Sequence, residues 1–202
     1  MNLFFGDSLT AGENNNNTSF VDYVKDSSFN LGISGTTIGE YSIYPVDGNS
    51  LLSVIGRTQN AIKTADKIFL EYGCNDVAAI MCGFATIQTV TVSLVKAIDW
   101  IRQLNPVCKI YFLALGNEST INTFARNECY YLENNYFSEF DFKFPISVFS
   151  DIYNKILINI YKICDIIYMF DDDVSSDWLS DDGVHPNNAG HIEIASNIDV
   201  YM

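Results

Sequence analysis

Short apolar runs separated by longer amphipathic stretches form the basic pattern of this chain. Each of the five runs has the length of a β-strand and stops at a glycine or a polar residue. The runs occupy residues 1–5, 29–33, 67–72, 109–115 and 166–170. Because they are continuously apolar rather than alternating, we expect strands that are covered on both faces of a sheet.

Helical periodicity fills the segments between these runs. Over residues 86–104, apolar positions recur three and four residues apart, and Asn105-Pro106 ends the pattern. A second strong stripe predicts a helix over residues 147–163. Weaker patterns predict helices at residues 19–25, 51–65 and 120–134, and from 187 to about 198, whereas the asparagine-rich residues 12–18 are expected to form an exposed loop.

The alternation of strands and helices favours a parallel sheet with right-handed crossovers. We therefore predict an α/β fold, a three-layer α/β/α sandwich around a five-stranded, mostly parallel, flavodoxin-like sheet. Since no internal repeat or linker divides the chain, residues 1–202 are expected to form a single domain. Within it, residues 116–146 are either core or an active-site lid or wall, because ligand sites form beyond the carboxyl ends of such strands.

Composition and charge exclude several classes of partner. Of the 202 residues, 48% are hydrophobic, which is enough for a substantial core at this length. Eleven Lys and Arg against 25 Asp and Glu give a formal net charge of −14, which disfavours nucleic acids and anionic membrane surfaces. No apolar run reaches the roughly 18 residues of a membrane span. The first residues do not resemble a signal peptide, so we expect a cytoplasmic protein, or a secreted one if a leader has been removed.

The cysteine and histidine residues do not form a metal-binding pattern. The five cysteines are scattered without a C-x-x-C pair, which favours reduced, buried thiols. His185 and His191 lie six residues apart and would not share a helix face, so His191 is interpreted as structural or superficial. The acidic residues 171–182 lack the central glycine and the closing glutamate of a calcium-binding loop. We therefore expect no metal and no other cofactor.

Polar residues near the two ends of the chain are candidates for nucleophilic catalysis. Ser8 directly follows the first predicted strand, where a sharp turn would lift its hydroxyl above the sheet edge, although serines there also commonly cap helices. Asp182 precedes His185 by three residues across a glycine-containing turn. The carboxylate can therefore reach Nδ1 and leave Nε2 free as a base. The alternative is a turn histidine that Asp182 binds locally.

Two further residues fit an oxyanion hole beside Ser8. Gly35 and Asn75 each follow a strand-like run, so both are expected at the same sheet edge as the serine. Gly35 offers a backbone N–H and Asn75 a side-chain amide, which together with the N–H of Ser8 could stabilise an oxyanion. Glycine and asparagine are also common turn residues, and this alternative remains open.

Taken together, four sequence blocks resemble the SGNH (GDSL) hydrolase family. The resemblance spans residues 6–187 and implies Ser8 as nucleophile, His185 as base with Asp182 as its partner, and an oxyanion hole of Ser8, Gly35 and Asn75. Gly32 is a second candidate for the oxyanion glycine, and Cys74 either packs or narrows the pocket. In order, the blocks are Gly6-Asp7-Ser8-Leu9-Thr10, Asn30-Leu31-Gly32-Ile33-Ser34-Gly35, Gly73-Cys74-Asn75-Asp76 and Asp182-Gly183-Val184-His185-Pro186-Asn187.

The resemblance implies a serine ester hydrolase that acts through an acyl-enzyme on a small-molecule or glycan ester. A short, acidic chain without a lipid-docking helix favours small-acyl (acetyl) esters of carbohydrate-type substrates. A lysophospholipase or a thioesterase is the alternative within the family, and a catalytically silent carbohydrate-binding module on the same fold is the alternative outside it. The aromatic residues of segment 116–146 either pack in the core or form a wall for sugar: Phe124, Tyr130, Tyr131, Tyr136, Phe137, Phe140, Phe142 and Phe144.

Overall fold

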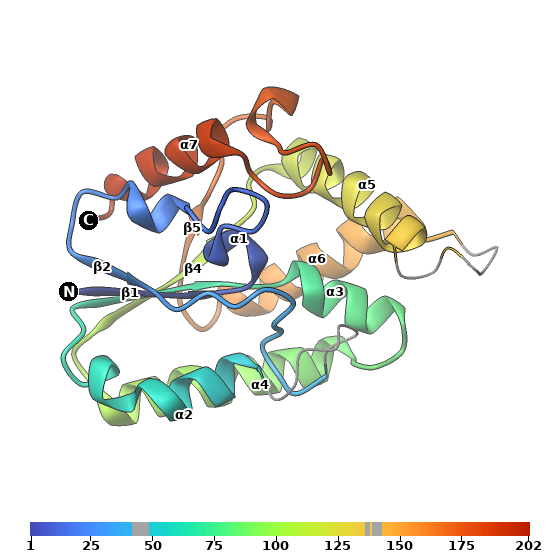
Figure 1. The fold of residues 1–202 in the computed structure, drawn as a ribbon. Coiled ribbons are helices and arrows are strands. Elements are labelled where there is room, and N and C mark those ends of the chain that lie inside the picture. Colours follow the sequence, from blue (N-terminus) through green and yellow to red (C-terminus); the bar gives the residue numbers. More distant parts are fainter. Residues whose placement is uncertain (42–48, 136–137, 139–142) are drawn as a thin grey trace.

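Five parallel strands form the central sheet of a computed structural model that describes residues 1–41, 49–135, 138 and 143–202 (Figure 1). The strands are β1 (Asn2–Gly6), β2 (Ser28–Asn30), β3 (Lys67–Glu71), β4 (Lys109–Ala114) and β5 (Asp165–Tyr168). Their order is β2-β1-β3-β4-β5, and every pairing is parallel. This order confirms the predicted flavodoxin-like sheet.

Helices cover both faces of the sheet, which confirms the predicted three layers. In the view of Figure 1, α2 and α4 lie below the sheet and contact each other, while α7 lies above it. None of the described helices is long and apolar enough to cross a bilayer. The helices are α1 (Ser8–Ala11), α2 (Leu51–Ile62), α3 (Cys74–Met81), α4 (Ile87–Leu104), α5 (Glu118–Asn135), α6 (Ile146–Ile160) and α7 (Asn188–Asp199), with 3₁₀ turns at Phe20–Asp22 and Ser176–Trp178.

Aromatic side chains on neighbouring strands tie the middle of the sheet together. Phe4 of β1 is in register with Phe69 of β3, and their rings stack with centroids 4.4 Å apart. Phe69 in turn stacks on Tyr111 of β4 at 5.3 Å. Burying each phenylalanine stabilises the fold by roughly 2–3 kcal/mol. This stack therefore ties together β1 and β3, the strands that precede Ser8 and Asn75.

The edge strand β2 differs from its prediction. Residues 29–33 were expected to be a buried strand, but β2 covers only Ser28–Asn30 and the side chain of Phe29 is 55% exposed. The reason is its position, because β2 pairs with β1 on one side and, among the described residues, no strand pairs with its other side. An apolar run identifies a strand, but it does not say whether that strand is central.

Segment 116–146 contributes both to the core and to the surface. Phe124 and Phe144 are buried, whereas Tyr130 is 67% exposed and Tyr131 is half-buried. The segment contains α5, which contacts α6. The remaining aromatic residues of the segment lie outside the described residues: Tyr136, Phe137, Phe140 and Phe142.

The five cysteines are free thiols. Cys129 is fully buried, and the other four are partly buried and pack against the core, so the expectation of buried thiols holds fully for Cys129 and in part for the others. Burial raises the pKa of Cys129 to about 12 and that of Cys164 to about 11. Because the thiolate is the reactive form, these two thiols are poor nucleophiles at neutral pH.

Candidate active site

Ser8 stands at the start of α1, two residues after β1 ends at Gly6. Asp7 caps this helix, and its Oδ1 accepts a hydrogen bond from the backbone N–H of Leu9 at 3.1 Å. The first N–H groups of a helix have no acceptor within the helix, and the N–H of Ser8 is one of them. The strand-to-helix turn thus presents both the hydroxyl and the backbone amide of Ser8 at the carboxyl edge of the sheet.

Ser8, His185 and Asp182 form one hydrogen-bonded chain. The Oγ of Ser8 lies 2.9 Å from Nε2 of His185, and Nδ1 of His185 lies 2.5 Å from Oδ2 of Asp182. The other oxygen of Asp182 accepts hydrogen bonds from the backbone amides of Val184 at 2.9 Å and His185 at 3.0 Å. These amides hold the carboxylate against the imidazole. The fold therefore brings together a serine and a histidine that are 177 residues apart in the sequence.

Burial and hydrogen bonding together determine the charges of His185 and Asp182. Burial would lower the pKa of His185, but the hydrogen bond and the negative charge of Asp182 raise it above its ordinary value. Burial would raise the pKa of Asp182, but hydrogen bonds from His185 and two backbone amides hold it well below its usual range. Asp182 is therefore a carboxylate at neutral pH. Its position assigns the proton of the neutral imidazole to Nδ1, so Nε2 faces Ser8 as an acceptor.

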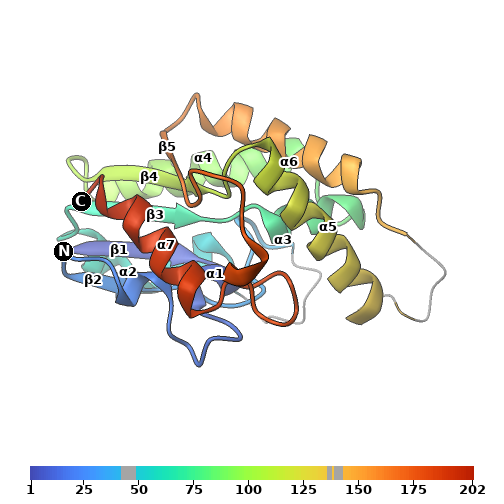
Figure 2. The ribbon, with the colours of Figure 1, turned by 90° about the horizontal axis from the view of Figure 1, so that it is seen from above.

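An open cavity lies beside the hydrogen-bonded chain of Ser8, His185 and Asp182. Gly35 and Asn75 line it together with Ser8 and His185, as predicted from their positions after strands. Its remaining lining residues are Glu13, Ser34, Glu128 and Tyr131. All four belong to segments that follow the carboxyl ends of strands. Figure 2 shows that these ends of the strands lie opposite the N- and C-termini.

The turn that carries Gly35 requires a glycine. Gly35 has φ +74°, a left-handed conformation that other residues adopt only with strain, and Thr36 donates a backbone hydrogen bond across the turn to Ile33. The alternative oxyanion residue, Gly32, does not line the cavity but packs against α1. A Cβ at Gly32 would come within 2.6 Å of the backbone nitrogen of Ala11. Close packing, rather than a place in the cavity, thus accounts for Gly32.

Asn75 is held in place by two acceptors. Its Nδ2 donates to the carbonyl oxygen of Thr36 at 2.9 Å and to Oδ2 of Asp7 at 3.2 Å. Both amide hydrogens therefore have partners in the protein. To donate to an oxyanion, Asn75 must exchange one of these bonds, and the longer one to Asp7 is the easier to lose.

Three buried carboxyl groups, those of Asp7, Glu71 and Asp76, belong to or contact residues that neighbour Ser8 and Asn75 in the chain. Glu71 accepts hydrogen bonds from the backbone of Asp7 and from the hydroxyl of Thr10, while Asp76 accepts from the backbone of Ile38 and the hydroxyl of Tyr41. Burial raises the pKa of Asp7 and Glu71, and it raises that of Asp76 to about 7. Among the described residues, no group of side chains has the arrangement of a metal site.

The buried Asp76 should make the protein less stable as the pH rises from about 4 to 7. An unfolded aspartate ionises near pH 4 and the buried one near pH 7, so unfolding releases a proton between these values. The free energy of unfolding should therefore fall by about 1.4 kcal/mol per pH unit from this group alone. Urea midpoints at about pH 5 and about pH 7 measure the fall, which should be smaller in Asp76→Asn. The exposed Asp26→Asn is the control, and an equal fall in both variants would contradict the assignment.

Asn14 is a site residue that the sequence did not reveal. Its Nδ2 donates to Oδ2 of Asp182 at 2.6 Å and lies 3.4 Å from Nδ1 of His185. The backbone of Asn14 is left-handed, as are those of Asn16 and Asn17. Asparagine tolerates this conformation better than most residues, which explains the asparagine-rich composition of the loop. Composition indicates such a loop, but it cannot indicate that the loop reaches Asp182.

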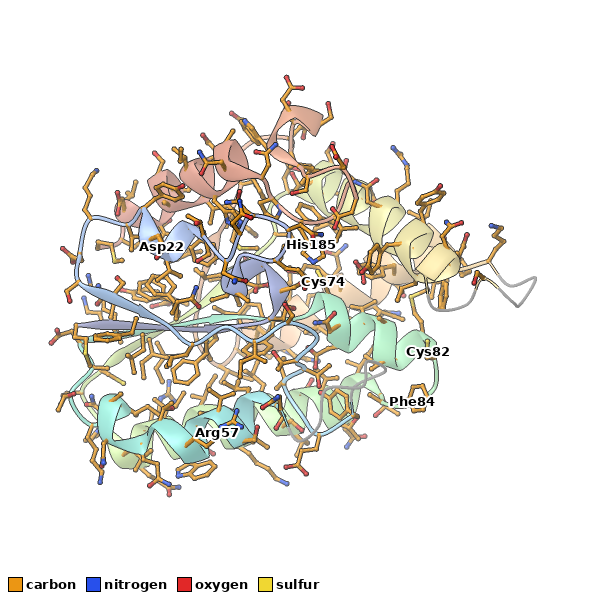
Figure 3. The ribbon with its side chains drawn as sticks, in the orientation of Figure 1. Asp22, Arg57, Cys74, Cys82, Phe84 and His185 are labelled. Carbon is orange, nitrogen blue, oxygen red and sulfur yellow. The ribbon has the colours of Figure 1, made fainter. Side chains whose placement is uncertain are left out.

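Cys74 and His191 do not line the cavity. Cys74, at the start of α3, packs against the hydrophobic core, and burial raises the pKa of its thiol. Figure 3 labels Cys74 at the start of α3, and Cys82 and Phe84 beyond the other end of this helix. His191 is buried, accepts a hydrogen bond from the backbone of Phe20 at 3.2 Å, and has its pKa lowered to about 4 by burial. Cys74 and His191 therefore pack within the fold and have structural roles.

The fold and the site together define a class, the α/β serine hydrolases, in which a hydroxyl, an imidazole and a carboxylate meet at the edge of a parallel sheet. A sequence model of the GDSL-like lipase/acylhydrolase family matches residues 4–191. The chain belongs to this family. This confirms the resemblance that the four sequence blocks carried.

Several solved structures share the fold at low sequence identity. A lipase from a goat rumen metagenome is 14% identical, with a TM-score of 0.65 over 98% of this chain and 95% of that one. A family two carbohydrate esterase from Clostridium thermocellum, in complex with cellohexaose, is 15% identical, with a TM-score of 0.59 over 99% and 62%. An extracellular lipase from Streptomyces rimosus is 12% identical, with a TM-score of 0.58 over 96% and 97%. No curated protein sequence matches the chain.

Proposed function

We propose that this hydrolase is a serine esterase that cleaves small-acyl esters, above all acetyl esters of carbohydrate-type alcohols, through an acyl-enzyme. The observation that carries the proposal is the continuous hydrogen-bonded chain from Ser8 through His185 to Asp182 beside an open cavity. A silent binding module would have no use for a buried, charge-stabilised imidazole within hydrogen-bonding distance of a serine hydroxyl.

The proposed mechanism uses only side chains of this site. Nε2 of His185 takes the proton of Ser8 as Oγ attacks the ester carbonyl, and Asp182 stabilises the resulting imidazolium. The tetrahedral intermediate then breaks its bond to the alcohol oxygen, which takes the proton from Nε2. A water molecule gives a proton to the same nitrogen and attacks the acyl-enzyme. Release of the acid returns that proton to Ser8.

The oxyanion of each intermediate is proposed to bind three donors. These are the backbone N–H groups of Ser8 and Gly35 and the side-chain amide of Asn75, all of which border the cavity. Loss of one such donor typically lowers kcat about 100- to 1,000-fold. Because Asn75 donates a hydrogen bond to Asp7, the oxyanion would replace Asp7 as an acceptor.

The lining of the cavity supports a short acyl group. None of the eight described residues that line the cavity is aliphatic, and two of them are glutamates. A long acyl chain gains about 0.8 kcal/mol per methylene only where it is buried against apolar surface. Tyr131 supplies a phenol ring to the described lining, and the centroid of this ring lies 6.3 Å from that of the His185 imidazole. These features favour an acetyl ester of a polar alcohol over a lysophospholipid or a long-chain thioester.

A comparison of esters with short and long acyl chains tests the substrate class. We expect kcat/KM to be higher for p-nitrophenyl acetate than for p-nitrophenyl octanoate, because the leaving group is the same and only the acyl chain differs. Faster cleavage of the octanoate would favour a lysophospholipase or a thioesterase instead.

A fluorophosphonate probe tests whether the site is active at all. The probe reacts with an activated serine, so mass mapping should find the label on the peptide that contains Ser8. An unlabelled protein would support the silent binding module.

Activity should be lost on the acid side at a higher pH than an ordinary histidine would give. His185 acts as a base only when neutral, and the negative charge of Asp182 raises its pKa above about 6.5. The pH profile of kcat/KM for p-nitrophenyl acetate measures this limb, and tryptophan fluorescence at each pH checks that the fold persists. A rate that stays constant down to about pH 5 would show that His185 is not the base.

Asn14→Gly should lower kcat/KM about tenfold. Glycine tolerates the left-handed backbone at this position, so the variant removes the hydrogen bond to Asp182 without straining the loop. One hydrogen bond to a charged group is typically worth about 1.5 kcal/mol, which corresponds to this factor. Asn16→Gly is the matched control, because Asn16 is also left-handed and is exposed. Equal rates for the two variants would remove Asn14 from the site.

A further inference from the structure

Two glutamates from different parts of the chain line the cavity of Ser8. Glu13 follows α1, and its backbone N–H donates to the carbonyl of Ser8 at 3.1 Å, which fixes it beside the helix. Glu128 belongs to α5 and is only 5% exposed. The catalytic scheme above uses neither of them, so their place in the cavity needs another explanation.

Glu13 lies on the side of the cavity where the alcohol must leave. Its Oε2 is 3.8 Å from Nε2 of His185, the nitrogen that gives its proton to the departing oxygen. An alcohol oxygen within hydrogen-bonding distance of Nε2 is therefore also close to the carboxylate of Glu13. A positive charge a few bonds away from that oxygen would contact Glu13 directly.

Glu128 adds negative charge from the wall of α5. Its charge reaches the imidazole, because both Glu128 and Glu13 contribute to raising the pKa of His185. Tyr131 lies three residues later on the same helix and also lines the cavity. Carboxylates next to an aromatic ring are a combination that binds ammonium groups, through charge and through the face of the ring.

Apart from the catalytic histidine, the ionisable side chains of the described lining are acidic or phenolic. The described lining residues include no lysine or arginine, and the chain as a whole carries a formal charge of −14. The field of the cavity therefore favours cations and repels anions such as phosphate esters. Resting on the proposed esterase function, we propose that Glu13 and Glu128 select esters whose alcohol carries an ammonium group, as in acetylated amino sugars or amino alcohols.

A matched pair of esters isolates the effect of this charge. Acetylcholine and 3,3-dimethylbutyl acetate have nearly the same shape and differ by one positive charge. The ratio of their kcat/KM values should exceed about 10 in favour of the cation at low ionic strength, and it should fall as salt screens the field. Replacing Glu13 or Glu128 by glutamine should lower the ratio several-fold, and the double variant should bring it close to one. Glu118→Gln, on the exposed side of α5, is the control and should leave the ratio unchanged.

The pH profile separates selection of substrate from tuning of the base. If the glutamates only raised the basicity of His185, Glu13→Gln would move the acid limb to lower pH for both esters and leave their ratio unchanged, which would overturn the proposal. A neutral ester cleaved as fast as the cationic one would also overturn it. So would cleavage of neither ester by an enzyme that cleaves p-nitrophenyl acetate. If all three esters survive and the fluorophosphonate does not label Ser8, the proposed esterase function fails as well.

Discussion

Replacing Ser8 by alanine should lower kcat for p-nitrophenyl acetate by about 10⁶-fold, because loss of a serine nucleophile typically removes covalent catalysis altogether. The hydroxyl is half-buried and its hydrogen-bond partner in the structure is His185, so its removal should not affect the fold. Thermal unfolding and far-UV circular dichroism should therefore match those of the wild type. The initial rate at saturating ester measures the loss.

Ser34→Ala is the matched control for this prediction. Ser34 also lines the cavity, so the same truncation occurs within the same site. The proposed mechanism gives it no proton to transfer, and kcat should change less than tenfold. If Ser8→Ala keeps more than about 1% of the wild-type rate, or if Ser34→Ala loses as much as Ser8→Ala, Ser8 is not the nucleophile.

Asp182→Asn should lower kcat by about 10⁴-fold, the loss typical of a triad whose histidine is held in the wrong tautomer. The carbonyl oxygen of an asparagine can still accept from the backbone amides of Val184 and His185, so the turn should persist. Its NH₂ group would then face Nδ1 of His185. That nitrogen must become an acceptor, which places the imidazole proton on Nε2, towards Ser8.

The same variant should shift the pH dependence that remains. Burial lowers the pKa of His185, and the charge of Asp182 normally opposes this effect. Without that charge, the pKa of His185 should fall. The acid limb of kcat/KM should therefore move to lower pH, an effect that a general loss of structure would not produce. Asp181→Asn, at the exposed neighbouring residue, should keep both the rate and the profile. A profile of Asp182→Asn that coincides with the wild type would show that this carboxylate does not act on His185.

Much of the fold could be predicted from local patterns. The helix predicted over residues 86–104 is α4 (Ile87–Leu104), because one buried stripe recurs along its whole length and Thr86 caps its start. The strand predicted over residues 67–72 is β3 (Lys67–Glu71), whose last four residues are all buried. In both elements the burial of each residue follows from its own neighbours in the chain.

Two helices at the site were missed for physical reasons. α1 (Ser8–Ala11) has four residues, which is too short for a periodic pattern. α3 (Cys74–Met81) is buried over residues 75–79, so it has no polar face to alternate with an apolar one. Both begin within the family's sequence blocks, where turn residues give no sign of a helix.

The sequence by itself determined the order of strands and helices, the family, and the residue types available for catalysis, because each depends on neighbouring positions in the chain. Only the tertiary structure decided that Ser8 reaches His185, that Asn14 contacts Asp182, and that two glutamates line the cavity of Ser8. Those contacts depend on the order of strands in the sheet and on how loops pack at its edge. Neither the order of strands nor the packing of loops produces a repeating pattern in the sequence. The residues of the site could therefore be named in advance, but their surroundings could not.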